Sequence, residues 1–448
     1  MKKNYTLTLG LVCSLVLNTY SQWNVQTNKA LAAQRSVRNI SIANATTAWI
    51  SFSDGSGTSN PPKSLREFSK TTDGGATWTS RTITSLASGL ELNQISGVSD
   101  MIAYAAFADT KNGGALISKT VDGGVTWTTS FNTPDPGWAN VINFWDAQTG
   151  VWTGDPSGSP KAFEIYTTTN GGTNWNKKTA PAPNNAAEYG IPSVSAVNGN
   201  HIWFGTTNGR VYHSPDKGNT WTVGSTNAPG TINLTKVVTA IAFQDGNTGF
   251  AIVNDTYYKT TNGGATWAVF NSFTGIPYTS SIAYVPGTTN TYYSVGDKSS
   301  STGSSYSQDG GNTWINIDDI QHNAVAFFNS QIGWAGGFAQ ADGSGTTGGI
   351  YKWDGSVGIL KNEVNNTVFG LYPNPSKETL TLRVDEKAFD KNLQVNIFDV
   401  VGRKVYSTTS TINSGTIELN LTDLHNGTYF IKVDNGNQEY VEKFIILK

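Results

Sequence analysis

The chain has 448 residues, which is enough for more than one domain and a sizeable core. A formal net charge of −2, with no basic run, argues against nucleic acid or an anionic membrane surface as a partner. The 48 glycines, with aromatic residues at 11% and charged residues at only 14%, favour an all-β protein of short strands and glycine turns.

The first 22 residues are typical of a secretory signal peptide. Lys2 and Lys3 precede an apolar run at 7–17, and residues 19–21 supply a cleavage region. The apolar run is too short to span a bilayer and no later segment comes close, so no transmembrane segment is expected. The only cysteine, Cys13, lies inside this signal and matches a lipoprotein box poorly. We therefore expect a mature protein without disulfides, thiol nucleophiles or zinc–thiolate sites.

One nine-residue motif then recurs along most of the chain. Its six copies are KTTDGGATW (70–78), KTVDGGVTW (119–127), TTTNGGTNW (167–175), HSPDKGNTW (213–221), KTTNGGATW (259–267) and YSQDGGNTW (306–314). Their tryptophans are 49, 48, 46, 46 and 47 residues apart. A period this steady predicts a repeat architecture, although it names no ligand.

Each copy reads Ser/Thr-x-Asp/Asn-x-Gly-x-Thr-Trp, except that Asn174 replaces the threonine of the third copy and should weaken it. An Asp or Asn side chain in a tight turn accepts hydrogen bonds from backbone N–H groups a few residues on. Glycine supplies the positive φ that such a turn needs, and the tryptophan can fill the gap between stacked sheets. The motif therefore predicts a hairpin turn between two strands.

This motif resembles the Asp-box, or BNR repeat, of sialidase-like β-propellers, and the resemblance covers roughly residues 23–355. In that family the box is the turn between the third and fourth strands of a blade, away from the binding face. The resemblance implies a structural role for the third residue of each copy, rather than a catalytic or metal-binding ring. The residues concerned are Asp73, Asp122, Asn170, Asp216, Asn262 and Asp309.

Seven short aromatic runs indicate the number of blades. They are AWISF (48–52), IAYAAF (102–107), GVWTG (150–154), HIWFG (201–205), GFAIV (249–253), TYYSVG (291–296) and IGWAGGF (332–338). The last run lacks a following box, whereas residues 22–27 look like the strands that follow each box. We therefore predict a seven-bladed β-propeller, closed by pairing the N-terminal strand into the last blade. A six-bladed ring is the alternative if the seventh unit is degenerate.

The aromatic- and glycine-rich composition of the repeats ends after residue 355. Residues 356–367 are predicted to be a polar linker, and residues 368–448 a small Ig-like antiparallel β-sandwich. Several motifs of this second unit resemble the type A C-terminal sorting domain of type IX secretion cargo. They are the YPNP segment at 372–375, Asp399 with Gly402 and Arg403, Gly427 with Tyr429, and the final run at 443–448.

That resemblance implies export across both membranes of a Gram-negative bacterium, with the type IX machinery as a partner. A secreted protein, or one fixed to the outer cell surface, is therefore expected. A generic Ig-like adhesive module is the alternative for this unit.

Candidate site residues lie in the loops that share the face opposite the boxes. Acidic residues there could form the acid–base pair of a glycosidase, and aromatic residues beside them could stack on sugar rings. The same side chains could instead solvate surface loops or cap the core. The acidic candidates are Glu91, Asp135, Asp155 and Glu188, and the ligand-binding candidates are Trp138, Tyr189 and Tyr278.

A non-catalytic binding module for a glycan or a protein fits this sequence better than an enzyme. A sialidase needs an arginine triad that the ring lacks, a xyloglucanase-like enzyme uses two propellers, and no Ser/His/Asp arrangement is apparent. A glycoside hydrolase acting on extracellular polysaccharide remains the alternative. The repeats also resemble the propellers of photosystem assembly factors and sortilin, which bind proteins or peptides. We expect no cofactor and no metal site, although carboxylate-rich loops could hold Ca²⁺.

Overall fold

The computed structural model describes most of the chain as strands and turns. The described residues are 23–26, 33–56, 64–133, 137–227, 235–298, 301–341, 346–354, 369–384, 392–400, 402–412, 415–434 and 439–448. The predicted signal peptide, the predicted linker and Asp135 lie outside them. Across the described residues there is no helix, so the all-β prediction is confirmed. The chain divides into two compact units, Met1–Val357 and Gly358–Lys448.

Most of the first unit consists of antiparallel four-stranded sheets, each formed by consecutive strands. The first of these sheets contains β6 (Leu90–Gly97), β7 (Ala103–Asp109), β8 (Ala115–Thr120) and β9 (Thr128–Asn132). The second contains β10 (Ala139–Phe144), β11 (Gly150–Ser157), β12 (Ala162–Thr168) and β13 (Asn176–Lys178). The third contains β14 (Gly190–Asn198), β15 (His201–Thr206), β16 (Arg210–Ser214) and β17 (Thr222–Ser225). The fourth contains β18 (Val238–Phe243), β19 (Gly249–Val253), β20 (Thr256–Thr260) and β21 (Ala268–Val269). The fifth is β22 (Ser281–Tyr284), β23 (Tyr292–Lys298), β24 (Ser301–Ser307), β25 (Ile315–Asp318).

The remaining strands of this unit form one eight-stranded sheet. It contains β2 (Arg35–Ile42), β3 (Ala48–Asp54), β4 (Glu67–Thr71), β5 (Thr79–Thr82), β26 (Ala324–Asn329), β27 (Ile332–Ala341), β28 (Thr346–Trp353) and β1 (Trp23–Val25). Only one residue pair, Ser36 with Phe338, joins β2 to β27, so the sheet consists of two four-stranded groups.

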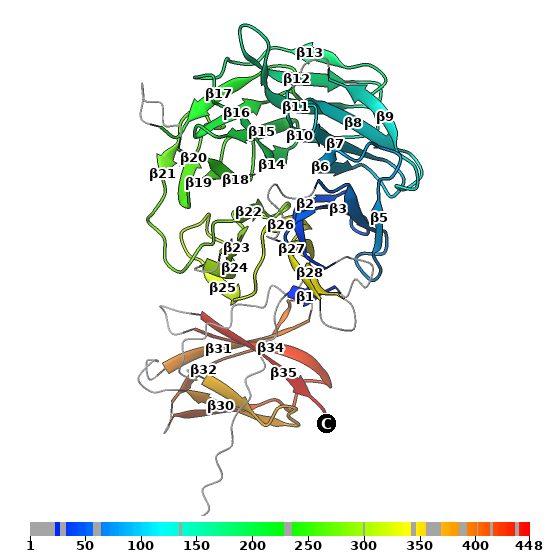
Figure 1. The fold of residues 1–448 in the computed structure, drawn as a ribbon. Coiled ribbons are helices and arrows are strands. Elements are labelled where there is room, and N and C mark those ends of the chain that lie inside the picture. The colour runs from blue at the N-terminus through cyan, green and yellow to red at the C-terminus, as the bar shows by residue number, and fades with distance from the viewer. Residues whose placement is uncertain are drawn as a thin grey trace, which may run out of the picture. The chain divides into compact units, whose positions relative to one another are not determined.

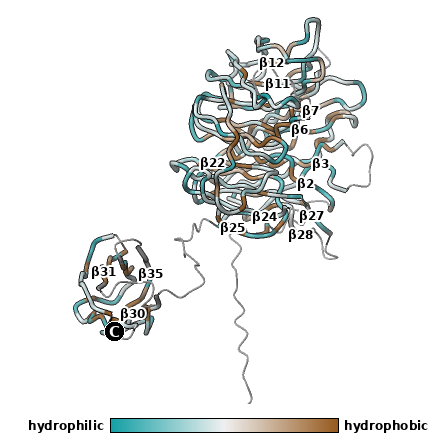
Figure 2. The backbone as a smooth tube through the Cα atoms, turned by 90° about the vertical axis from the view of Figure 1, so that its left-hand side faces the viewer, coloured by the Kyte–Doolittle hydropathy of each residue, from teal (hydrophilic) through white to brown (hydrophobic). Residues whose placement is uncertain are grey.

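These sheets are arranged around a central axis (Figure 1). Residues of β2, β6, β10, β14, β18, β22 and β26 line a single central cavity of about 390 Å³. The strand next to each of these carries the aromatic run noted in the sequence, and its largest side chains are buried between neighbouring sheets. Trp49, Tyr104, Trp152, Trp203 and Trp334 are all fully buried. Apolar segments run along strands such as β7 and β11, as the hydropathy colours show (Figure 2).

The N-terminal strand completes the last group of strands, as predicted. Trp23 lies opposite Trp353, and Val25 lies opposite Tyr351, in an antiparallel β1–β28 pair. Trp23 is 2% exposed, and its indole N–H donates a hydrogen bond to Ser304 Oγ over 3.0 Å. Backbone pairing therefore joins the two ends of the unit, and the buried Trp23 side chain also reaches β24.

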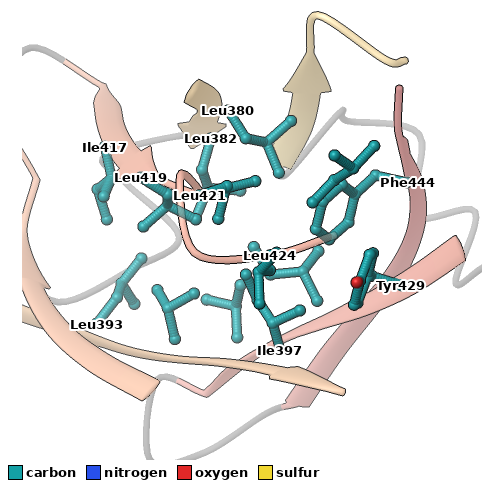
Figure 3. Close-up of a cluster of buried hydrophobic side chains, with 14 of the residues drawn as sticks. Leu380, Leu382, Leu393, Ile397, Ile417, Leu419, Leu421, Leu424, Tyr429 and Phe444 are labelled. Carbon is teal, nitrogen blue, oxygen red and sulfur yellow. The ribbon is translucent and has the colours of Figure 1, made fainter. Parts of the chain in front are cut away.

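The C-terminal unit consists of two antiparallel sheets around one core. The first contains β29 (Phe369–Tyr372), β30 (Thr379–Val384) and β33 (Thr416–Asn420), and the second β32 (Lys404–Thr411), β31 (Asn392–Asp399), β34 (Gly427–Asp434) and β35 (Glu439–Ile446). Leu380, Leu382, Ile397 and Phe444 contribute to the shared core, and none of them is exposed (Figure 3). Asn374 of the YPNP segment ties the two sheets together, because its Oδ1 accepts a 3.0 Å hydrogen bond from the Ile445 amide.

Candidate functional site

The six repeated turns share one pattern of hydrogen bonds. In the first copy, Asp73 accepts from the Thr71 hydroxyl at 2.8 Å and from the Thr77 amide at 2.9 Å, while the Gly75 amide donates to Thr71 Oγ1 at 2.8 Å. Gly75 has a φ of 91°, which a residue with a side chain rarely adopts. The corresponding residues Asp122, Asn170, Asp216, Asn262 and Asp309 accept the same two bonds within their own turns.

These bonds lower the pKa of the turn carboxylates. Hydrogen bonds from the Thr77 hydroxyl and amide lower the pKa of Asp73 to about 2, and bonds from Thr126 do the same for Asp122. A carboxylate whose acceptors are filled locally is a poor proton donor or acceptor near neutral pH. In the third turn Asn174 donates only its amide, over 2.9 Å, so the hydroxyl bond made by Thr77 in the first turn has no equivalent there.

The inner strands carry polar bulges at one end of the cavity. The register shifts at the same place in β2, β6, β10 and β18. At each shift one residue has no pairing partner on the neighbouring strand, and these residues are Arg38, Asn93, Asn140 and Thr239. Two of them connect neighbouring sheets, since Arg38 donates to Asn93 Oδ1 at 2.7 Å and Asn93 donates to the Ala139 carbonyl at 2.7 Å. Asn140 donates to Asp155 of the same sheet. Bulges commonly redirect side chains in this way at the edges of sites.

Asp155 is the centre of the most distinctive cluster on this face. Its Oδ1 accepts hydrogen bonds from Asn140 Nδ2 at 2.8 Å and from the Gly190 amide at 2.9 Å. Burial raises the pKa of Asp155 from its ordinary value of 3.8 to about 6, and these two bonds offset part of that rise. Gly190 is required here, because a Cβ would lie 2.2 Å from Asn140 Nδ2. The carbonyl oxygen Oδ1 of Asn140 is buried and has no hydrogen-bond partner.

Two predicted aromatic candidates adjoin Asp155. The Asp155 amide donates to the carbonyl of Trp138 at 2.9 Å, and Tyr189 immediately precedes Gly190. Trp138 is half-buried, whereas Tyr189 is 41% exposed and has the Lys161 ammonium 5.9 Å from its ring centroid. Backbone contacts therefore place Trp138 and Tyr189 beside Asp155, and we refer to these three residues as the Asp155 cluster.

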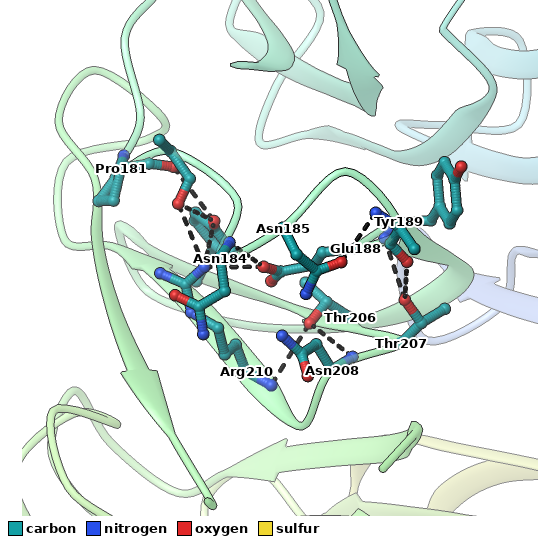
Figure 4. A network of polar contacts seen from close by, with 12 residues as sticks. Pro181, Asn184, Asn185, Glu188, Tyr189, Thr206, Thr207, Asn208 and Arg210 are labelled. Carbon is teal, nitrogen blue, oxygen red and sulfur yellow. Dashed lines mark hydrogen bonds and ion pairs between the residues drawn. The ribbon is translucent and has the colours of Figure 1, made fainter. Parts of the chain in front are cut away.

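Glu188 lies in the same loop but points into a buried polar network (Figure 4). Its Oε2 accepts from Arg210 Nη1 at 2.8 Å and from the Asn184 amide at 2.7 Å, and its side chain is fully buried. Arg210 also donates to the Ala182 carbonyl at 3.1 Å. Both contacts hold this carboxylate inside the protein, so Glu188 is poorly placed to meet a ligand.

The other candidates are also occupied by contacts within the protein. Glu91 forms an ion pair with Arg38 at the rim of the cavity. Tyr278 is only 5% exposed, and its hydroxyl donates to Asn316 Oδ1 at 2.9 Å. Its ring consequently presents no face on which a ligand could stack. The sequence analysis did not identify Asn140 or Arg210, because a strand asparagine or arginine has no motif that marks its long-range partner.

The described residues contain no group of three or more His, Cys, Asp or Glu side chains placed to hold a metal ion. They also contain no helix long and apolar enough to cross a membrane.

The C-terminal unit matches a known family. Residues 370–447 fit the model of the secretion system C-terminal sorting domain. The C-terminal unit is a type IX sorting domain. This sorting domain implies the type IX secretion machinery as a partner, and secretion to the cell surface or extracellular space of a Bacteroidetes-type bacterium.

The first unit resembles solved structures in its fold. A structure of YCF48 bound to a D1 peptide is 17% identical, with a TM-score of 0.52 over 75% of this chain and 95% of that one. YCF48 from Cyanidioschyzon merolae is 16% identical, also with a TM-score of 0.52, over 74% and 98% of the two chains. These likenesses show a β-propeller fold and nothing further. No curated protein matches the chain in sequence.

Proposed function

We propose that this protein is an exported seven-bladed Asp-box β-propeller that binds an extracellular ligand without catalysis. The eight-stranded sheet counts as two blades in this proposal, with β1 completing the last one. The signal peptide at 1–22 would carry the chain across the inner membrane before the sorting domain engages the type IX machinery. The propeller at 23–355 would be the functional part of the exported protein.

The Asp155 cluster is the observation that supports a binding role. It brings the backbone of the half-buried Trp138 and of the exposed Tyr189 next to the carboxylate of Asp155, beside the bulge at Asn140. Such a combination suits a glycan, because sugar rings stack on aromatic side chains while their hydroxyl groups donate to carboxylate and amide oxygens.

The state of the acidic residues favours binding over hydrolysis. Glycoside hydrolysis uses a pair of carboxyl groups with different protonation states. Of the described candidates, Glu91 and Glu188 are engaged by Arg38 and Arg210, which leaves Asp155, whose pKa burial raises to about 6, without a second free carboxyl group among them. A protein or peptide is the second candidate ligand, because a propeller of similar fold has been solved with a bound peptide.

The test is a glycan-array screen of the first unit, with reducing-end release assayed on each hit. We expect binding without release, and an affinity loss of at least about tenfold for Trp138→Ala or Tyr189→Ala. Tyr278→Phe is the control, since it removes a hydroxyl group from a buried side chain elsewhere in the first unit, which we call the ring unit. Product release would overturn the non-catalytic role and make Asp155 the first acid to replace. Binding of envelope protein but of no glycan would assign the face to a protein partner.

A further inference from the structure

The four-stranded sheet of the sorting domain buries one face and presents the other to solvent. Ile397 and Ile431, on the central strands β31 and β34, belong to the core and are not exposed. Side chains alternate between the two faces of a strand, so the next residues, Phe398 and Phe430, point outward. Both side chains are only partly buried, and neither belongs to the core cluster.

The register of the sheet places these outward residues in one row. Phe398 lies directly opposite Phe430 on the neighbouring strand. Lys404 on β32 lies opposite Phe398, and Lys443 on β35 lies opposite Phe430. The row therefore reads lysine, phenylalanine, phenylalanine, lysine across the four strands, and both lysines are exposed.

Further apolar side chains lie near this row. Ile445 follows Lys443 by two residues on β35 and is 36% exposed, and Val400, in the turn after β31, is 68% exposed. We call Phe398, Val400, Phe430 and Ile445 the outer apolar face. Exposed apolar residues that occur singly need no explanation, but a contiguous group rimmed by charge is typical of a protein interaction site.

We propose that the outer apolar face, with Lys404 and Lys443 at its sides, is the surface through which the sorting domain docks on the secretion machinery. The partner surface is apolar and flanked by carboxylates, because it must cover the phenylalanines while neutralising the lysines. Two aromatic residues at the centre of a patch, with charged residues around them, correspond to the anchors and rim of a specific interface. This inference concerns export alone and does not depend on the ligand of the propeller.

The decisive experiment measures export of the full chain in a bacterium that has a type IX system. The double substitution Phe398→Thr with Phe430→Thr keeps β-forming residues in both strands while removing the aromatic anchors. We expect the exported fraction to fall at least about tenfold, with the protein accumulating in the periplasm. Val269→Thr is the matched control, because Val269 is 53% exposed but lies on β21 of the first unit.

A second pair of variants tests the charges without touching the apolar residues. Lys404→Glu with Lys443→Glu should also reduce export, whereas Lys404→Arg with Lys443→Arg should preserve it. Both lysines are exposed, so these variants retain the fold even if the phenylalanine variant does not. Normal export of the glutamate variant, or an equal loss with Val269→Thr, would overturn the assignment of this face.

Discussion

Asp155 and Asn140 illustrate how single residues on this face differ from those in the repeated turns. In the turns, hydrogen bonds outweigh the cost of burial and the pKa of the aspartate falls. At Asp155, burial outweighs two hydrogen bonds and the pKa rises to about 6. An aspartate such as Asp73 in the turns therefore keeps its negative charge near neutral pH, whereas Asp155 can change its protonation state near pH 6.

The raised pKa of Asp155 makes a prediction about stability. A carboxyl group whose pKa is raised on folding stabilises the protein fully below its unfolded pKa of about 3.9, and that contribution is lost as the pH rises through about 6. Asp155→Asn keeps the Oδ1 acceptor and cannot ionise. We expect the variant to be more stable than the wild type at pH 7.5 by up to about 2 kcal/mol, with no such gain at pH 4. Urea unfolding at the two pH values measures this difference.

Asp146 on the same sheet is a suitable control. Hydrogen bonds from the Gln148 amide lower its pKa, so its contribution is present above the unfolded pKa and is lost as the pH falls. Asp146→Asn should therefore not stabilise the protein at pH 7.5. A gain of equal size in both variants would show that loss of a surface charge, and not the burial of Asp155, was responsible.

At the residue scale, the sequence predicted the turn residues and not their long-range counterparts. Asp73 and its equivalents bond within a few positions of themselves, so the local motif contains all of their chemistry. Glu188 is neutralised by Arg210 and Tyr278 is covered by its surroundings, and both facts depend on how separate segments pack. Asp155 and Tyr189 come together only because Gly190 of one sheet approaches Asn140 of another.

At the scale of the elements, lysine side chains connect one repeated turn to the next. Lys70 donates to the Gly123 carbonyl at 2.9 Å, Lys119 to the Gly171 carbonyl at 3.0 Å, and Lys259 to the Gly310 carbonyl at 3.1 Å. Each lysine is the first residue of its own motif and reaches a glycine in the motif of the next sheet. The lysine ammonium groups also lie over aromatic rings, as Lys119 Nζ does at 5.2 Å from the Tyr104 centroid.

We predict that these lysines contribute to the stability of the ring unit. Lys119→Met retains the aliphatic stem but removes the hydrogen bond and the cation–π contact, and should destabilise the unit by about 1 kcal/mol. Thermal unfolding monitored by tryptophan fluorescence measures the change. Lys111→Met, at an exposed position in the β7–β8 turn, should stay within about 0.5 kcal/mol of the wild type. Equal effects at both positions would mean that the contact with the next turn is unimportant.

The positions of the strands could be predicted from the sequence, whereas the bulges within them could not. The period of the motif and the aromatic runs located the strands closely, since the run at 48–52 falls within β3 and the strand at 22–27 contains β1. The bulges at Arg38, Asn93 and Asn140 were not predictable, because a bulge arises from the fit of one strand to its neighbour. Of these three residues, Arg38 lines the cavity.

At the scale of the whole molecule, two units with separate cores share one chain. We predict that Trp23→Ala destabilises the ring unit by about 3–5 kcal/mol, because it empties a buried site and leaves Ser304 without its indole donor. The sorting domain should be unaffected, so hydrogen exchange should quicken only in residues of the ring. Val25→Ala, on the same strand but 47% exposed, is the control and should change stability little. Faster exchange throughout the sorting domain would contradict this independence.

The pairing of β1 with β28 has a consequence for refolding. The two strands stand at opposite ends of the ring unit in sequence, so their pairing closes a very long loop and forms late. Until β1 pairs with it, the outer edge of β28 presents unpaired N–H and C=O groups, to which the β1 strand of another copy can also add. At high protein concentration the β1 strand of a second copy competes for this edge. Exchange of β1 between copies, giving strand-swapped dimers, is therefore the expected by-product of concentrated refolding.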